Sequence, residues 1–267
     1  MNDKNLKNAR SRAAKLQRHL VKSVAAAVRD YAMIAEGDRV MVCVSGGKDS
    51  YALVELLVAL GRQSKVKFEL FAVHLDHMMP DFPTDVLSRW FGQTSIPFSV
   101  VRQDIYATVK RVIPEGKNMC GLCSRLRRGA LYRHAAAQGM TKIALGHHRD
   151  DMVETLFLNM FHGGRIKGMP PKLLTDSGKH VVIRPMAYVG EKDIIRYAAL
   201  RAFPIITGDF CGTPDNLQRQ AVKAMLGQWR KRYPGRVETI FRSIQNVDPS
   251  QLADRQLFDF NFPASLA

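Results

Sequence analysis

The sequence lacks any apolar run long enough to cross a membrane. Its longest apolar stretch, Tyr51–Leu60, is interrupted by Glu55, whereas a spanning helix needs roughly 18 or more apolar residues. The N-terminal segment carries scattered charges and no apolar core before a small-residue cleavage site, a pattern that excludes a secretory signal. We therefore expect a cytoplasmic protein without a membrane partner.

Cysteine is scarce, with four residues in a chain of 267. Structural disulfides are rare in a cytosolic chain of this size, so metal binding or redox chemistry is the first use to consider for these thiols. Low-complexity tracts and internal repeats are absent. The hydrophobic fraction of 46% is enough to bury a substantial core, which argues against disorder and fits one large domain with small appendages.

Acidic residues are missing from two long stretches. The chain carries 40 Lys and Arg against 24 Asp and Glu, a formal charge of +16, and neither residues 116–149 nor residues 216–237 contain an acid. Such surfaces attract polyphosphates, because each neutralised phosphate releases condensed counterions. A generally basic, soluble surface is the alternative. The charge favours a nucleic-acid partner without saying which kind.

Short apolar runs alternate with helical patterns over most of the chain. The runs at 40–44, 68–76, 97–103, 141–146 and 181–185 predict strands, and the patterns at 51–60, 84–93, 124–138, 151–161 and 191–201 predict helices. This alternation predicts an α/β fold with a doubly wound, mostly parallel sheet covered on both faces. We expect a basic helical lead-in over 1–36, the α/β domain over 37–211 and a basic helical C-terminal region over 212–267.

A glycine-containing loop lies between the first predicted strand and the first predicted helix. It comprises Ser45, Gly46, Gly47, Lys48, Asp49 and Ser50. Two glycines let the backbone turn its N–H groups inward at a helix start, which makes an anion site, and the lysine and the serine hydroxyls can add phosphate contacts. The spacing differs from that of the nucleoside-triphosphatase loop. An ordinary Gly-Gly turn is the alternative reading.

A second polar loop follows the apolar strand 141–145 and opens a helix. It contains Gly146, His147, His148, Asp150 and Asp151. Adjacent carboxylates at a helix start are often capping residues. At the same sheet edge as the first loop, however, the two carboxylates can coordinate Mg²⁺ or position a substrate, and for the histidines we favour substrate or loop contacts over metal binding.

The remaining chemistry lies in a C-x-x-C pair. Cys120 and Cys123 stand at a helix start, where the helix dipole and Arg125, Arg127 and Arg128 favour thiolates. The spacing alone fits a zinc half-site, a redox dithiol or an iron–sulfur half-site. Cys211 lies in a polar, turn-forming segment, an unusual place for a core cysteine, whereas Cys43 lies inside an apolar strand and is interpreted as a small buried hydrophobe.

The hexapeptide 45–50 resembles the S-G-G-x-D-S signature of the PP-loop ATP pyrophosphatases, and residues 146–151 resemble that superfamily's G-H-x-x-D-D element. The resemblance implies that residues 37–211 form an ATP-binding catalytic domain that cleaves ATP between the α and β phosphates with Mg²⁺. Ser45, Gly46, Gly47, Asp49 and Ser50 would hold the pyrophosphate portion, with Lys48 as an added cation. His74 and Asp76, at the end of the second strand, match the position of the adenosine contact.

Within that superfamily the chain resembles the tRNA 2-thiocytidine synthetases. Their later C-G-x-x-x-N-L-Q-R element is matched by Cys211, Gly212 and residues 216–219, and the match extends through residues 111–117, 123–129, 144–151, 169–173 and 231–236. The resemblance implies a [4Fe–4S] cluster on Cys120, Cys123 and Cys211. A Cys₃His zinc site that uses His74, His147 or His148, or a metal-free persulfide relay on the C-x-x-C pair, are the alternatives.

The expected activity is ATP-dependent thiolation of a tRNA cytidine, at position 32 if the chain follows the family. The C2 oxygen would be adenylated and then replaced by sulfur, with Asp49, Asp150 and Asp151 managing metal and charge and Arg127 and Arg128 neutralising phosphate or a developing oxyanion. A sulfur donor such as a cysteine desulfurase and a homodimer are implied as partners. A 2-thiouridine or lysidine synthetase, a zinc-containing RNA-binding protein without turnover and a small-molecule amidating synthetase are the rival hypotheses.

Overall fold

A six-stranded sheet forms the centre of the computed structural model, which describes residues 3–114, 116–117, 119–207 and 217–261. Along the sheet the strands run in the order β3 (Phe98–Arg102), β2 (Phe68–Asp76), β1 (Asp38–Cys43), β4 (Lys142–Ala144), β6 (Val181–Ile183) and β5 (Lys172–Leu174). The first five are parallel, and β5 pairs with β6 in the antiparallel sense. The predicted doubly wound, mostly parallel α/β fold is confirmed.

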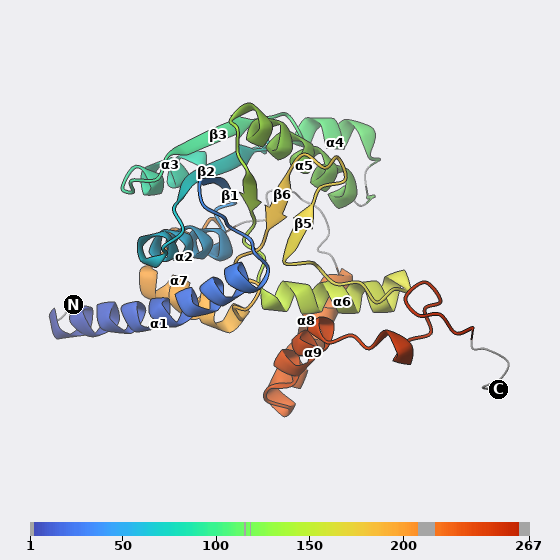
Figure 1. Cartoon of the computed structure of the whole chain (residues 1–267). Helices are drawn as coiled ribbons and strands as arrows, with labels where there is room; N and C mark the ends of the chain where they lie inside the picture. Colours follow the sequence, from blue (N-terminus) through green and yellow to red (C-terminus); the bar gives the residue numbers. More distant parts are fainter. Residues whose placement is uncertain (1–2, 115, 118, 208–216, 262–267) are drawn as a thin grey trace.

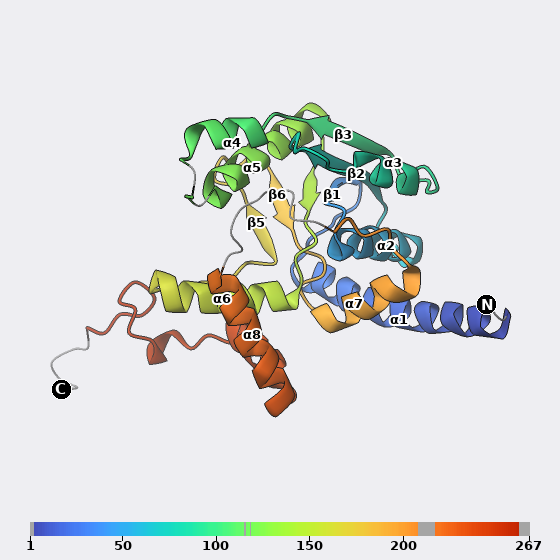
Figure 2. The same cartoon turned by 180° about the vertical axis from the view of Figure 1, so that it is seen from behind.

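Helices cover both faces of the sheet (Figure 1). On one side α1 (Asp3–Asp30), α2 (Lys48–Gln63) and α7 (Glu191–Arg201) contact one another, and α3 (Thr84–Phe91) packs into the same core. On the other side lie α4 (Tyr106–Val112) and α5 (Cys120–Ala137). At one end of the sheet α6 (Arg149–Gly163) carries α8 (Leu217–Arg232) and α9 (Arg236–Gln245), and a 3₁₀ turn follows at Pro249–Gln251. The view from behind shows α8 crossing α6 (Figure 2).

The central strand shows how the sequence specifies this layering. Val40 and Val42 of β1 join the core under α1, α2 and α7, whereas Met41 joins the core under α4 and α5. All three are at most 1% exposed. Successive side chains of a strand point to opposite faces, so a strand that is buried on both faces reads as a continuous apolar run.

The structure also contains elements that the sequence patterns did not predict. The helix α4 and the edge strand β5 were not expected, and α5 begins at Cys120 instead of Ser124. The C-x-x-C pair therefore lies inside the first turn of α5 and not before it. Among the described residues, no helix combines the length and the hydropathy that a membrane span requires.

Candidate active site

The loop between β1 and α2 is fixed by contacts on both sides. Gly46 has a φ of +85°, a conformation that residues with side chains rarely adopt. The amide of Ile206 donates to the Gly46 carbonyl at 3.0 Å, and the Ser50 hydroxyl donates to the Gly47 carbonyl at 2.8 Å. Because the N-cap residue Gly47 has no side chain, the first amides of α2 are left for an anion.

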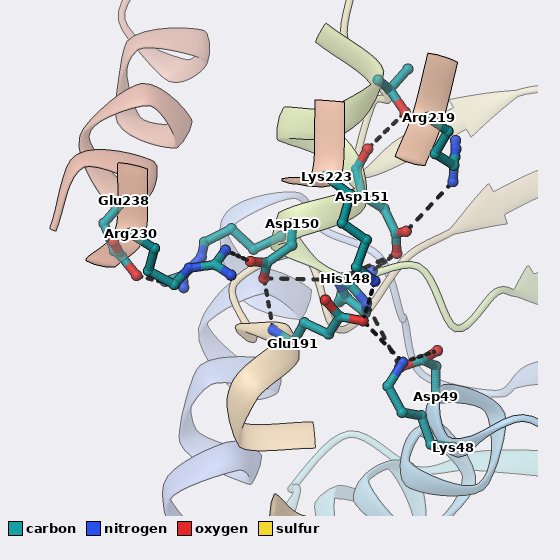
Figure 3. A network of polar contacts seen from close by, with 12 residues as sticks. Lys48, Asp49, His148, Asp150, Asp151, Glu191, Arg219, Lys223, Arg230 and Glu238 are labelled. Atoms are coloured by element: carbon teal, nitrogen blue, oxygen red, sulfur yellow. Dashed lines mark hydrogen bonds and ion pairs between the residues drawn. The ribbon is translucent and has the colours of Figure 1, made fainter. Parts of the chain in front are cut away.

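The loop after β4 packs directly on the loop after β1. A Cβ added to Gly146 would lie 3.2 Å from the carbonyl carbon of Asp49, so glycine permits this close approach. His148, which is 3% exposed, lies between carboxylates of both loops (Figure 3). Its Nε2 is 3.7 Å from Asp49 Oδ1, and its Nδ1 is 3.4 Å from Asp151 Oδ2. The structure thus brings the two sequence motifs together at one edge of the sheet.

The two adjacent aspartates of the second loop have different surroundings. Asp150 is 2% exposed; its Oδ2 accepts the backbone N–H of Glu191 at 2.7 Å, and its Oδ1 accepts a hydrogen bond from Arg230 of α8. Asp151 lines the site cavity and accepts the His148 amide at 2.9 Å through Oδ2. Asp150 therefore contacts α7 and α8, whereas Asp151 is the carboxylate that lines the cavity.

Asp49 and Lys48 belong to a network of ion pairs that reaches α8. The Lys48 ammonium lies 3.0 Å from Asp49 Oδ2 and 3.2 Å from Glu191 Oε1, and the Lys223 ammonium of α8 lies 2.7 Å from the same Glu191 oxygen. Although burial opposes ionisation of both groups, these partners raise the pKa of Lys48 and lower the pKa of Glu191. Sequence reasoning missed Glu191, because an acid at a helix start looks like an ordinary cap.

One carboxylate oxygen of Asp49 takes no part in this network of ion pairs. Asp49 Oδ1 is buried and accepts no hydrogen bond from any described residue, and the His148 Nε2 atom 3.7 Å away is too distant to form one. An unpartnered buried carboxylate oxygen is costly unless a cation or a donor occupies the space beside it. It is therefore the clearest candidate for a Mg²⁺ ligand in this loop.

A cavity of about 850 Å³ opens beside these loops. From the first loop, Ser45, Asp49 and Ser50 line it, whereas Lys48, Gly46 and Gly47 do not. The second loop contributes Gly146, His147 and Asp151, and α5 contributes Cys120, Cys123, Arg127 and Arg128. The phosphate loop and the C-x-x-C pair, which are about 70 residues apart in sequence, therefore share one cavity.

The two residues predicted at the adenosine position lie differently. His74 lines the cavity and stacks on Phe82 with ring centroids 5.2 Å apart. Its Nδ1 donates to the Val44 carbonyl at 2.9 Å, and burial lowers its pKa, so its Nε2 is an acceptor. Asp76 is not among the lining residues; its Oδ1 accepts the amide of Met78 at 2.8 Å. Asp76 shapes the turn after β2, and His74 is the candidate ligand contact.

The four cysteines differ in their position relative to the cavity. Cys120 is exposed and Cys123 half-buried, both in the first turn of α5. Cys43, interpreted from sequence as a buried hydrophobe, also lines the cavity, and burial raises its pKa to about 12 although Arg127 opposes this shift. Cys211 lies outside the described residues, as do Gly208 to Asn216 as a whole. Within the described part of the chain, no three His, Cys, Asp or Glu side chains converge as a metal site.

Comparison with known proteins agrees with the geometry. The PP-loop domain model matches residues 13–227. The chain belongs to the PP-loop family. A protein of Methylococcus capsulatus called tRNA-cytidine(32) 2-sulfurtransferase is 61% identical over 246 residues, which cover 92% of this chain and 85% of that protein. A protein of the same name from Vibrio parahaemolyticus is 56% identical over 98% of this chain and 89% of its own length.

A solved structure shows the same fold at low sequence identity. The U34-tRNA thiolase NcsA from Methanococcus maripaludis, solved with its [4Fe–4S] cluster, matches with a TM-score of 0.71 and 19% identity over 89% of this chain and 81% of that chain. At that identity the likeness concerns the backbone arrangement. It extends the PP-loop fold seen here to an enzyme that carries a cluster.

Proposed function

We propose that this chain is an ATP-dependent tRNA sulfurtransferase that converts a cytidine, at position 32, into 2-thiocytidine. One observation supports this most strongly: a single cavity is lined by Ser45 and Asp49 of the phosphate loop and by Cys120 and Cys123 of α5. A reaction that activates an oxygen with ATP and then replaces it with sulfur needs both sets of groups around one substrate atom. The names of the relatives at 56–61% identity agree with this substrate.

In this proposal Cys120, Cys123 and Cys211 would hold a [4Fe–4S] cluster. Two thiols three residues apart in one helical turn can bind neighbouring irons. On the N-terminal side of residues 208–216, Ile206 is hydrogen-bonded to the phosphate loop, and on their C-terminal side Arg219 of α8 lies 3.9 Å from Asp151. Both flanks of the interval that holds the third cysteine are therefore at the site. With three protein ligands, such a cluster would supply an iron at which sulfide could be held.

The chain's own residues account for the activation step. The amides at the start of α2 and the hydroxyl of Ser45 hold the β and γ phosphates, while the Ser50 hydroxyl fixes the loop through the Gly47 carbonyl. Asp49 Oδ1 with Asp151 offers oxygen ligands to Mg²⁺. The cytidine C2 oxygen bonds to the α-phosphorus as the bond to the β-phosphate bridging oxygen breaks and pyrophosphate leaves. Arg127 and Arg128, which line the cavity, stabilise the negative charge that develops.

The second step exchanges oxygen for sulfur at the same carbon. A thiol reductant releases sulfide from the persulfide of a donor such as a cysteine desulfurase and is itself oxidised to a disulfide. The sulfide attacks C2, the C2–O bond breaks and AMP leaves with that oxygen. Asp150 takes no direct part, because its carboxylate is occupied by Arg230 and the Glu191 amide. The helix α5, from the acid-free segment 116–149, lines the cavity, and α8, from the acid-free segment 216–237, contacts the lining residue Asp151 through Arg219. These two helices provide the basic surface for tRNA. A cytoplasmic location and a homodimer complete the proposal.

A reconstituted reaction tests the proposal. Anaerobically purified protein is incubated with unmodified tRNA, ATP, Mg²⁺ and sulfide, and the nucleosides are identified by mass spectrometry. We expect 2-thiocytidine from the wild type, none from Cys120→Ala or Asp49→Asn, and iron content lost only in the first variant. Cys43→Ala is the matched thiol control and should keep its iron.

The fold likeness to a U34-tRNA thiolase makes 2-thiouridine formation the second candidate function. The appearance of 2-thiouridine without 2-thiocytidine would overturn the substrate assignment. Stoichiometric zinc without iron would overturn the cluster.

A further inference from the structure

His147 is held by a neighbouring arginine that is itself fixed in place. Arg184, directly after β6, is 8% exposed. Its Nε donates to His147 Nδ1 at 3.3 Å, and its Nη1 donates to the carbonyl of Pro170 at 2.5 Å. Its backbone amide donates to the Pro171 carbonyl at 2.8 Å. The guanidinium group therefore has one orientation, and it presents an N–H to the imidazole ring.

This contact decides where the histidine carries its hydrogen. A guanidinium group has donors only, so His147 Nδ1 must be the acceptor, and a neutral imidazole then carries its hydrogen on Nε2. The ring is neutral at pH 7, because burial and the charge of Arg184 lower the pKa of His147 to about 4, with Asp151 acting in the opposite direction. His147 is therefore a neutral donor with a fixed tautomer.

The location of His147 connects this donor with the reacting base. His147 and Arg184 line the same cavity as Cys123 and Arg127, and the charge of Arg127 acts on the His147 ring. The ring and the C-x-x-C pair therefore line one cavity, and Arg127 of α5 is close enough to the ring for its charge to act on it. A cytosine placed for thiolation at C2 must turn the edge that carries O2 and N3 toward this region. On that edge cytosine N3 is an acceptor, whereas uracil carries a hydrogen at N3.

We propose that His147 is a specificity-determining residue, whose Nε2–H donates a hydrogen bond to N3 of the target cytosine, and that Arg184 is the positioning residue that fixes this hydrogen. The inference rests on the proposed function and deepens it. A uracil in the same pose would bring two donors face to face. Sites built to bond one polar edge reject the mismatched edge by up to ~10⁴-fold, and one such contact in a partly open cavity is expected to supply ~100-fold.

The first test compares tRNA transcripts with cytidine or uridine at the target position. For each we measure kcat/KM of the reconstituted full chain as wild type, His147→Ala and His147→Gln. We expect His147→Ala to lower the cytidine value ~100-fold and leave the uridine value nearly unchanged, so that discrimination is largely lost. The glutamine variant can present either N–H or C=O, so it should keep most cytidine activity and gain uridine activity. A wild-type cytidine-to-uridine ratio in His147→Ala would overturn the proposal.

An atomic substitution in the RNA tests the bond itself. 3-Deazacytidine has a C–H in place of N3, and tRNA containing it should bind the wild type ~10-fold more weakly than cytidine tRNA. The same replacement should not weaken binding to His147→Ala, because the partner is already missing. An equal loss in both proteins would contradict the contact. ATP titration and thermal melting of both proteins show whether the variant has kept its fold.

The role of Arg184 has a readout that needs no turnover. The ¹⁵N chemical shifts of the His147 ring in labelled protein distinguish the Nε2–H tautomer from the Nδ1–H tautomer and from the cation. We expect the Nε2–H form at pH 7 in the wild type, a mixture in Arg184→Met, and the wild-type form again in Arg184→Lys, which keeps a donor. A wild-type Nδ1–H form would refute the assignment. If the wild type thiolates neither base, the proposed function fails, while the tautomer result still stands.

Discussion

The ion pair between Asp150 and Arg230 is expected to hold α8 against the active site. The side chain of Asp150 is 3% exposed and that of Arg230 is 35% exposed. Removing one partner of a fully buried pair costs about 3–5 kcal/mol, because a charge is left buried without compensation. Solvent reaches Arg230, so we expect Arg230→Met to lower the free energy of unfolding by about 2–3 kcal/mol. Asp150→Asn keeps an acceptor for the Glu191 amide and should cost about 1–2 kcal/mol.

Urea denaturation of the two single variants and the double variant measures the coupling. Once the charge of Asp150 is gone, loss of Arg230 leaves no buried charge without a partner. The double variant should therefore lose about 1–2 kcal/mol less free energy of unfolding than the sum of the two single variants. The exposed pair Asp85 and Arg89, with side chains 66% and 72% exposed, is the matched control, for which we expect changes below about 0.5 kcal/mol. If the costs of the Asp150 and Arg230 substitutions were additive, the ion pair would not hold α8 in place as described.

Three further results are expected. Gly46→Ala should lower the free energy of unfolding by about 1–3 kcal/mol and weaken ATP binding, because φ is +85° and the new Cβ would lie 2.7 Å from the side chain of Ile206. Gly37→Ala, at a φ of +76° but with open space around the new Cβ, is the control in urea denaturation and ATP titration. Cys43, with its pKa raised to about 12, should resist iodoacetamide at pH 8 in the intact protein, as read by peptide mass spectrometry, since the thiolate is the nucleophile. The pKa of Glu191 is lowered by its lysine partners, so its contribution to stability is fully present above the ordinary glutamate range and is lost as pH falls through the lowered pKa. Glu191→Gln should therefore cost about 1 kcal/mol at pH 7 and progressively less as the urea denaturation is repeated at acidic pH.

Much of the fold could be predicted because buried parallel strands have an unambiguous sequence pattern. The run 68–76 became β2 with the same bounds, and the pattern 191–201 became α7. The strand β5 could not be predicted in this way: its three residues are all exposed and lie at a sheet edge within a segment rich in glycine and proline. The start of α5 was missed because Gly121, a weak helix former, falls in its first turn.

The site was predictable as a set of loops but not as a set of contacts. Adjacent aspartates look equivalent in sequence, yet successive helical residues point about 100° apart, so Asp150 is buried against α8 while Asp151 faces the cavity. The partners of Asp150, Arg230 and the Glu191 amide, come from distant elements that no local pattern identifies. The third cysteine lies outside the described residues and remains a prediction, as do the catalytic roles.

The central claim is that ATP activation and sulfur insertion occur at one carbon within one cavity. The most direct measurement quantifies the AMP, pyrophosphate and 2-thiocytidine that the reconstituted protein forms from tRNA, ATP and sulfide. We expect equal amounts of all three and no nucleotide cleavage without tRNA beyond a low background. Release of ADP and phosphate, or AMP formation that continues while no thiolated cytidine appears, would contradict it.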